Sequence, residues 1–500
     1  MQETYEHRLK PKRDLLVYST GDCANSLVIN SIGAFAMLFY TEALGLDYKL
    51  AGFAMFIVTF WDAVSDPIMG HISDSTRCRF GRRHPYIFIG GLLMAASYYF
   101  IWNVPGVFRA EVFLFWYLVV VNFLLRTAYT IYNVSYIALG FEVCTDYDQR
   151  ASIQAWRWGF NMTANLAGPA LAWLVFFPDT IQGEATSITS NYIHMGTAFT
   201  VATALIVLFV AFGTRKYIID TRYRKDVVGG SIRELFVDLK DIFLDKQPRM
   251  VFIFIGIAFT GISLLASLQM YVYVHFMKFS SLQRAIVHGS TMIGCGLGGV
   301  LSALLVRKFD KKPTITISVL FSVFCNLVLF ILFVPGFVPP GFCWIIPDSA
   351  AVLAGVSIPV SMLVFLAFNS LFWTGVGVLN PIGHSMMADV SEICKYRTGV
   401  LKDAGYAAML SFLLKAALAI GALLCGFCLD WAGLDPGARE QTADAARNLA
   451  AITFISCAVI VLVALISIIR YPVTRAYMQK IKEALVAKEQ QANHIKDTAQ

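Results

Sequence analysis

Long apolar stretches recur along the whole chain, separated by shorter polar segments. Each stretch is long enough for a helix to cross a bilayer, which requires about 20 residues. Phe and Leu fill the stretches without strict alternation, so the pattern predicts membrane-spanning helices and not an outer-membrane β-barrel. Twelve spans are predicted, at residues 16–43, 50–73, 85–104, 112–141, 151–177, 193–213, 249–277, 284–306, 313–334, 360–388, 404–430 and 448–470.

The overall composition agrees with an all-α polytopic membrane protein. Of 500 residues, 57% are hydrophobic and only 15% are charged, whereas a soluble domain carries about 25% charged residues. The polar, basic N-terminus and the length of the first apolar run argue against a cleavable signal peptide. The sequence shows no metal-spaced histidine cluster, nucleophile elbow or phosphate-binding glycine loop, so we expect neither an enzyme nor a bound cofactor.

Basic residues predict the orientation, because cytoplasmic loops of membrane proteins are enriched in Lys and Arg. With both termini in the cytoplasm, most of the 40 lysines and arginines fall in cytoplasmic segments. The net charge of +7 then reflects topology and contact with anionic membrane lipids. Nucleic-acid binding is not expected, since the basic residues are spread over separate segments. The outer loops retain only Lys49, Arg109, Lys278, Arg284, Arg439 and Arg447.

The spans divide into two halves joined by a polar linker. Within the linker, residues 232–244 carry apolar side chains at helical spacing after a capping sequence, which predicts an amphipathic helix. A similar pattern from Val473 onward predicts a cytoplasmic helix in the tail. The predicted domains are an N-terminal six-helix bundle at 1–213, the cytoplasmic linker at 214–248, a C-terminal six-helix bundle at 249–470 and a cytoplasmic tail at 471–500.

The loops after the second and eighth spans have similar sequences. Both place a basic residue, Phe and a turn residue before two further basic residues and a Pro, at 79–85 and 308–313. Basic loops also arise from the orientation rule alone, but the matched Phe and Pro favour duplicated halves. In transporters built from such repeats, the substrate site lies near the midplane between the halves.

Acidic side chains interrupt the apolar second span. Asp62, Asp66 and Asp74 are separated by four and eight residues, so a helix places them on one face. Carboxylates within a membrane usually mark an ion or substrate pathway, and neighbouring carboxylates repel unless a cation or proton lies between them. We therefore predict a cation or proton site at Asp62 and Asp66, with a structural ion pair as the alternative. Asp74 is predicted to form a cytoplasmic latch with one of Arg77, Arg79, Arg82 and Arg83.

Other charged residues within the spans balance these acids. Arg126, Arg157 and Lys415 lie in the fourth, fifth and eleventh spans, and Asp22 lies in the first. The charges nearly cancel, as expected if they face a shared polar cavity. Two tryptophans flank Arg157, a combination that suits sugar rings and hydroxyls but also carboxylates and phosphates. Further candidates for the cavity wall are Tyr129, Thr130, Asn133 and Trp373, with packing in the core as the alternative for Trp373.

Two further patterns are interpreted as packing. Cys425 and Cys428 form a Cys-x-x-Cys within a span, and the sequence shows no metal or redox partners for them. Three histidines, His275, His288 and His384, lie within or near spans. A protonatable histidine that couples transport is the alternative.

These residues together resemble the glycoside–pentoside–hexuronide:cation symporter family, the melibiose-carrier-like branch of the major facilitator superfamily. The resemblance implies a twelve-helix major facilitator fold that works by alternating access. It also implies cation binding by Asp62, Ser65, Asp66 and Thr130, and a position near the cation for Lys415. Asp22 and Arg157 are implied in sugar binding. The likeness rests on Trp61-Asp62-Ala-Val-Ser-Asp66-Pro67-x-x-Gly70, the basic loop up to Pro85, Thr127–Tyr136, Met387–Gly399 and Lys415.

The chain also departs from the melibiose carriers. They have an acid at the position of Asn133, Asn at Ser65 and Trp at Ile137, so a galactoside is not assumed. The expected function is Na⁺- or H⁺-coupled symport of a small polar solute, preferably a sugar or glycoside. The alternative is a lysophospholipid or another amphipathic lipid, which a vertebrate branch of the family carries. We expect a monomer in the plasma membrane, or in the inner membrane if the source is bacterial.

Overall fold

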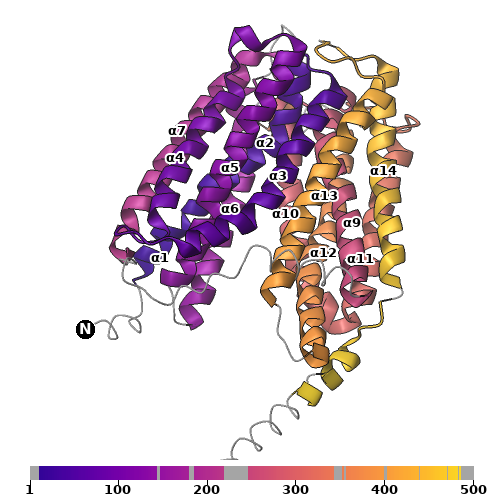
Figure 1. Cartoon of the computed structure of the whole chain (residues 1–500). Coiled ribbons are helices and arrows are strands. Elements are labelled where there is room, and N and C mark those ends of the chain that lie inside the picture. The colour runs from indigo at the N-terminus through magenta and orange to yellow at the C-terminus, as the bar shows by residue number, and fades with distance from the viewer. Residues whose placement is uncertain are drawn as a thin grey trace, which may run out of the picture.

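Long helices form two bundles that stand side by side (Figure 1). The computed structural model describes residues 11–143, 147–178, 185–218, 246–342, 352–353, 356–398, 403–438, 440–469, 471–481 and 483–485. The first bundle contains α1 (Lys12–Ser19), α2 (Gly21–Leu38), α3 (Tyr48–Ser75), α4 (His84–Trp102), α5 (Glu111–Val143), α6 (Tyr147–Leu171) and α7 (Thr189–Gly213). The second contains α9 (Lys246–Tyr271), α10 (Ser281–Phe309), α11 (Lys311–Phe333), α12 (Val360–Thr398), α13 (Asp403–Trp431) and α14 (Ala443–Ile469).

Eleven helical segments of the described chain are long and apolar enough to cross a membrane. The predicted fifth span, 151–177, is also helical, as α6 followed by a π-turn, η4 (Ala172–Phe176). It is not among the eleven, because polar residues such as Gln154, Arg157 and Asn161 interrupt its apolar sequence. An all-helical membrane architecture is thus confirmed, with a two-residue strand pair, β1 (Val352–Leu353) and β2 (Val356–Ser357), as a small addition.

Several predicted boundaries differ from the structure. The predicted first span corresponds to two helices, α1 and α2. A π-turn, η2 (Phe39–Ala43), follows α2. α12 continues through Thr398, beyond the predicted end of the tenth span at residue 388. The predicted linker helix at 232–244 lies outside the described residues.

The chain after α14 packs against the second bundle. Residues 475–481 are helical, and Val473, Met478 and Ile481 are buried in the same apolar cluster as Val390 of α12. The side chain of Arg475 donates a hydrogen bond to the carbonyl oxygen of Val306 at 2.6 Å. The amphipathic pattern of the tail therefore marks a helix whose apolar face covers the bundle.

The two bundles share one packing order. In the first bundle, α4 contacts α5 and α7, α5 contacts α3, and α2 contacts α6 and α7. The helices six spans later make the corresponding contacts: α11 with α12 and α14, α12 with α10, and α9 with α13 and α14. The matched loops also adopt the same turn, since Gly81 and Asp310 have positive φ values of 76° and 71°. The packing supports the duplication inferred from the loops.

A hydrogen bond from an asparagine amide to a tyrosine hydroxyl occurs at corresponding places in the two bundles. Asn122 donates a hydrogen bond to the Tyr40 hydroxyl at 2.7 Å in the first bundle. In the second bundle, Asn369 donates to the Tyr273 hydroxyl at 3.3 Å. Tyr40 is the second residue of η2, and Tyr273 is the second residue of the π-turn η7 (Val272–Phe276). The two π-turns therefore occupy equivalent places in the two bundles.

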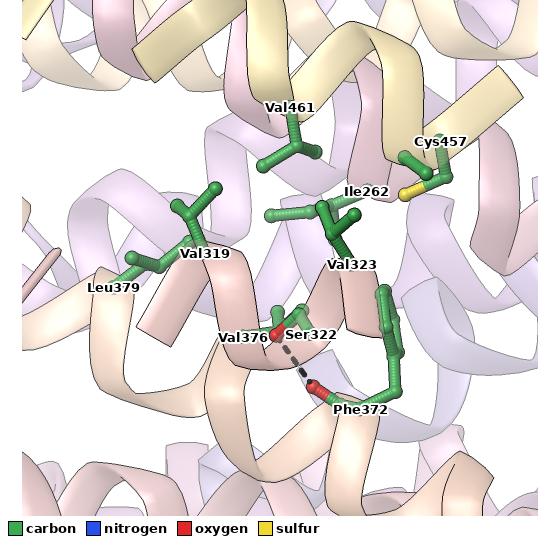
Figure 2. A pocket seen from close by; sticks show the side chains of 10 residues that line it. Ile262, Val319, Ser322, Val323, Phe372, Val376, Leu379, Cys457 and Val461 are labelled. Carbon is green, nitrogen blue, oxygen red and sulfur yellow. Dashed lines mark hydrogen bonds between the residues drawn. The ribbon is translucent and has the colours of Figure 1, made fainter. Parts of the chain in front are cut away.

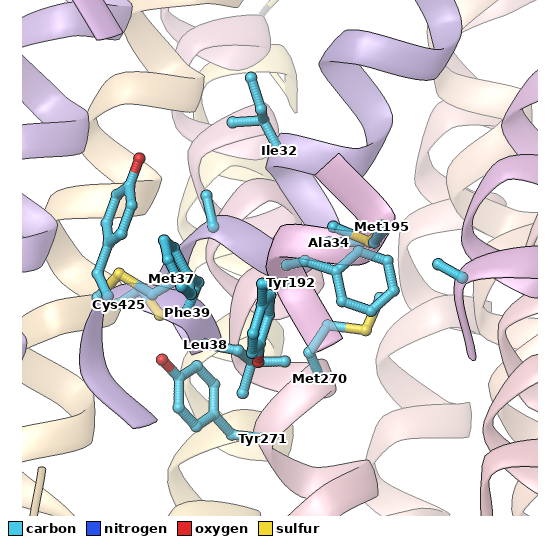
Figure 3. Close-up of a cluster of buried hydrophobic side chains, with 14 of the residues drawn as sticks. Ile32, Ala34, Met37, Leu38, Phe39, Tyr192, Met195, Met270, Tyr271 and Cys425 are labelled. Atoms are coloured by element: carbon cyan, nitrogen blue, oxygen red, sulfur yellow. The ribbon is translucent and has the colours of Figure 1, made fainter. Parts of the chain in front are cut away.

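The bundles contact each other most closely at the end that carries η2 and η7, which we call the closed end (Figure 1). There the hydroxyls of Thr41 and Tyr271 lie 2.7 Å apart. Figure 3 shows Met37 and Phe39 of the first bundle together with Met270 of the second in one apolar cluster. We call the other end, which carries the loops at 76–83 and 307–312, the basic end.

Small residues allow α10 and α12 to approach closely. A Cβ atom at Gly298 would clash with the carbonyl oxygen of Thr374, whereas a Cβ at the neighbouring Gly299 would meet no atom within 4 Å. We expect Gly298→Val to lower the free energy of unfolding by about 1–3 kcal/mol more than Gly299→Val, since overpacking adds to an equal helix-propensity cost. Thermal unfolding in detergent, followed by tryptophan fluorescence, measures the difference. Equal midpoints for the two variants would contradict the close contact.

Candidate functional site

Two carboxylates of α3 face a lysine of the other bundle. Asp62 and Asp66 are one helical turn apart, so both point from the side of α3 that packs against α5 and α13. The Nζ atom of Lys415 lies 2.5 Å from Asp66 Oδ2 and 3.2 Å from Asp62 Oδ2. Arg126 Nη1 lies 3.4 Å from Asp62 Oδ2. Two acids and two bases thus form a charge-neutral network that links the bundles.

A cluster of oxygen atoms adjoins the two carboxylates. The Thr130 hydroxyl lies 3.1 Å from Asp62 Oδ1 and from Asp66 Oδ1, and 3.0 Å from the Ser65 hydroxyl. A hydroxyl has one proton to donate, so Thr130 cannot satisfy both carboxylates at once. Oxygen ligands suit hard cations, and closely spaced carboxylates also hold protons. The cluster has the chemistry of a site for an alkali cation or an additional proton.

The same network borders a cavity of about 350 Å³ between the bundles. This volume lies within the range of about 300–1,000 Å³ that is typical of small-molecule sites. Asp62 and Arg126 line the cavity, so a bound solute would lie beside the candidate cation site. Most of the wall is apolar. Its other polar residues are Asn30, Thr59, Asn165, Ser263, Ser267 and His288.

Asp22 and Arg157 form a second buried ion pair, in the part of the first bundle nearer the basic end. Arg157 Nε lies 2.6 Å from Asp22 Oδ2, and Nη2 lies 3.3 Å from Oδ1. Tyr136 donates to Asp22 Oδ2 at 3.2 Å, and the guanidinium lies 5.2 Å from the Tyr136 ring centre. With Gln154 and Asn161, the pair lines a cavity of about 180 Å³. This cavity offers both charges and amides to a polar solute.

Three predicted substrate residues line neither of these two cavities. Asn133 accepts a hydrogen bond from Asn25 at 3.0 Å. Trp373 donates to Gln269 at 3.2 Å within the second bundle. Tyr129 packs against the larger apolar core cluster. Asn133 and Trp373 thus bond to side chains of their own bundles, and Tyr129 packs in the core.

The predicted latch lies at the basic end. Arg77 is exposed and Arg82 is partly buried, both in the loop between α3 and α4. The side chain of Asp74 lies outside what the structure describes, so its pairing stays a prediction. In the second bundle, Lys311 at the corresponding loop lies 2.5 Å from Asp389 Oδ2.

A third void, inside the second bundle, is too small for a solute. Its volume is about 10 Å³ and its wall is almost entirely apolar (Figure 2). The Ser322 hydroxyl in this wall donates to the Phe372 carbonyl at 3.1 Å. Cys425 and Cys428 are buried free thiols. Among the described residues, no group of three or more His, Cys, Asp and Glu side chains has metal-binding geometry.

Several cavity residues were not expected from the sequence, although a signal for them exists. Asn30 lies eight residues after Asp22 on α2, and Asn165 lies four residues after Asn161 on α6. Such spacing gives a helix a polar stripe. A stripe indicates that a helix has a polar face, but it does not show which neighbouring helix or cavity that face meets.

Duplicated helix bundles, apolar helices of membrane-spanning length and a charged centre beside a cavity define a membrane transporter. The sequence of the chain matches the family described as MFS/sugar transport protein over residues 17–475, and the chain belongs to that family. It is therefore a multi-pass plasma-membrane transporter of the major facilitator superfamily, and not an enzyme.

Relatives of known description agree with this class. The chain is 25% identical over 479 residues to the inner membrane symporter YicJ of Escherichia coli (strain K12), covering 95% of this chain and 94% of that protein. It is also 25% identical over 480 residues to the putative glycoside/cation symporter YagG of the same organism, covering 95% of each. A stretch of 157 residues is 31% identical to sodium-dependent lysophosphatidylcholine symporter 1-B of Danio rerio, covering 31% of this chain and 29% of that protein.

The fold is also that of solved transporters. A bacterial homologue of the iron transporter ferroportin, crystallised in an inward-facing state, superposes with a TM-score of 0.62 at 13% identity. The match covers 93% of this chain and 99% of that one. At this identity the likeness concerns the fold alone.

Proposed function

We propose that the protein couples Na⁺ or H⁺ to the symport of a small polar solute, with sugars and glycosides as the preferred class. The observation that carries the proposal is the network around Asp62 and Asp66. The single hydroxyl proton of Thr130 faces both carboxylates, their charges are balanced by Arg126 and by Lys415 from the other bundle, and Asp62 also lines the central cavity. The same group of residues therefore forms the proposed cation site, borders the solute cavity and links the two bundles.

In the proposed cycle, the cation takes the place of the Lys415 ammonium group beside the carboxylates. Lys415 belongs to α13, whereas Asp62 and Asp66 belong to α3, so its withdrawal removes a link between the bundles. A ligand shifts a conformational equilibrium only through its different affinity for the two states. The cation favours the state in which Lys415 is withdrawn, and this preference couples its binding to movement of the bundles.

The basic loops support a cytoplasmic location for the basic end and an outer location for the closed end. In this orientation the structure corresponds to an inward-facing state, since the contacts between the bundles lie toward the outer side. Both bundles of a single chain enclose the central cavity. The proposed transport unit is therefore a monomer.

Two observations bear on the solute. Asp22 and Arg157 offer a carboxylate and a planar donor to hydroxyls or to a carboxylate, which favours a sugar, glycoside or uronide. The relative described as a putative glycoside/cation symporter supports the same class. The mostly apolar wall of the central cavity, which includes Met55 and Met292, favours the second candidate, a lysophospholipid. The partial match to a lysophosphatidylcholine symporter points the same way.

The test uses the purified protein in liposomes. The solutes are 4-nitrophenyl glycosides, a 4-nitrophenyl glucuronide and lysophosphatidylcholine, and each is assayed for exchange and for accumulation under a separate Na⁺ or pH gradient. We expect exchange of at least one glycoside or glucuronide, and its accumulation under one gradient only. An ionophore that dissipates that gradient provides the control.

The outcomes separate the candidates. Transport of lysophosphatidylcholine alone would replace the glycoside proposal with the second candidate. Exchange without accumulation under either gradient would reject cation coupling while leaving the solute class in place. Exchange of none of these solutes by folded protein would reject both candidates.

A further inference from the structure

The second bundle contributes few polar side chains to the central cavity. Ser263 and Ser267 of α9 line it, but their hydroxyls donate to main-chain carbonyls of Leu418 at 3.4 Å and Ser263 at 3.1 Å. His288 of α10 also lines it, and the structure gives its imidazole no hydrogen-bond partner among the described residues. Among the described polar residues of the second bundle that line the cavity, His288 is the one whose hydrogen-bond donor and acceptor both remain available to a solute.

The burial of His288 makes this availability significant. The residue is only 7% exposed, so its ring has little access to bulk water. A neutral imidazole donates through one ring nitrogen and accepts through the other, which matches a hydroxyl group, itself both donor and acceptor. A solute hydroxyl in the cavity would satisfy the ring.

The opposite wall offers matching groups. Asn165 of α6 has no hydrogen-bond partner among the described residues. Asn30 of α2 donates its amide to the Ser26 hydroxyl at 2.7 Å, which leaves its carbonyl oxygen available. A hydroxyl-bearing solute held by these amides and by His288 would contact both bundles at once. Alternating access requires such shared contact, because binding energy can favour closure only if both halves take part.

We propose that His288 is a substrate-specificity residue, which hydrogen-bonds a hydroxyl group of the transported solute from the second bundle. The inference rests on the proposed transport of a hydroxyl-bearing solute and adds the residue through which the second bundle recognises it. The rest of that wall is apolar apart from Ser263 and Ser267, whose hydroxyl protons are already donated to main-chain carbonyls. His288 therefore selects among sugars by the position of a hydroxyl.

The test compares His288→Leu with His288→Gln, using exchange of the 4-nitrophenyl glycoside that the wild type exchanges fastest. Leu removes the hydrogen bonds, and we expect it to raise the half-saturating concentration about tenfold, the effect of about one hydrogen bond. Gln retains a donor and an acceptor and should recover most of the affinity. The matched control is Ile293→Leu, an exposed apolar residue of α10 that does not line the cavity.

Deoxy analogues of that glycoside make the test specific. The monodeoxy analogue that lacks the hydroxyl bound by His288 should bind the wild type about tenfold more weakly than the parent glycoside does. His288→Leu should bind this analogue and the parent glycoside equally well. Equal half-saturating concentrations for His288→Leu, Ile293→Leu and wild type would overturn the inference while exchange itself continues. If folded wild type exchanges none of the glycosides, the proposed function fails first and this inference with it. If His288→Leu does not fold, His288→Ala takes its place in the analogue series. A monodeoxy analogue that loses as much affinity in His288→Ala as in wild type, for every position of the missing hydroxyl, would overturn the role.

Discussion

Replacement of Asp66 by Asn is expected to abolish concentrative uptake while solute exchange continues. The side chain keeps its size but loses its charge, so Lys415 and Arg126 then face only Asp62. The network acquires a net positive charge where a cation must bind. The cavity and the Asp22 pair are unchanged, so a solute still binds and crosses in exchange.

The expected effect is large because the site is partly buried. An added unit charge at about 4 Å costs about 4 kcal/mol at an effective dielectric constant of about 20, which corresponds to about a thousandfold weaker cation binding. Uptake into liposomes under the driving gradient should fall to the level seen without a gradient. Exchange at equal solute concentrations should stay within about threefold of wild type.

Two further variants test the electrostatic explanation. Asp66→Asn combined with Lys415→Met restores a neutral pair of Asp62 and Arg126, so it should recover thermal stability but not coupling. Asp430→Asn is the matched control, because Asp430 pairs with Lys49 at the exposed rim at 2.8 Å. Accumulation by Asp66→Asn equal to that of wild type would refute the role of the site in coupling.

The charged centre and the helices follow from the sequence for physical reasons. A charge within a membrane is costly unless it is paired, so Asp62, Asp66, Arg126 and Lys415 were expected near one another, and the structure brings them into contact. Apolar length predicts where the chain crosses the membrane, but not where a helix ends. The polar residues after 388 end the apolar run of α12, yet the helix continues to Thr398.

The cavity wall was less predictable, because it depends on how each helix is rotated against its neighbours. Asn133 and Trp373 were expected at the wall, but their polar atoms bond to other side chains of their own bundles. His288 and Asn165 line the cavity instead. A polar residue in an apolar span needs some partner, and the sequence does not show whether that partner is a side chain or a solute.

At the closed end, an acid of one bundle faces a base of the other. Glu42 and His275 are the fourth residues of η2 and η7, which occupy equivalent places in the bundles. His275 Nε2 lies 3.3 Å from Glu42 Oε1, and Tyr48 donates to the same oxygen at 3.1 Å. Glu42 is 3% exposed and its Oε2 has no hydrogen-bond partner in the described structure. Tyr48 belongs to the same bundle as Glu42, so the contact with His275 is the one that exists only while the bundles meet.

Replacement of Glu42 by Gln is therefore expected to open the closed end. A contact between a carboxylate and a polar partner is worth about 1.5–3 kcal/mol, and a cost of this size that falls on the closed state alone raises the open population at least about tenfold. Electron–electron distances between spin labels report the change, in a variant without the native cysteines. We expect longer distances for Val107→Cys with Trp431→Cys at the closed end, and shorter ones for Phe80→Cys with Phe309→Cys at the basic end.

A charge swap distinguishes the ion pair from side-chain packing. Glu42→His combined with His275→Glu exchanges the two groups across the bundles without changing their number, so it should restore the closed-end distances. Glu111→Gln removes an exposed acid at the same end and should leave them unchanged. Unaltered distances in Glu42→Gln, or no recovery in the swap, would contradict the pair as the closing contact. Recovery would show that equivalent residues of the duplicated halves close the outer side together, so that one repeat supplies the acid and the other supplies the base.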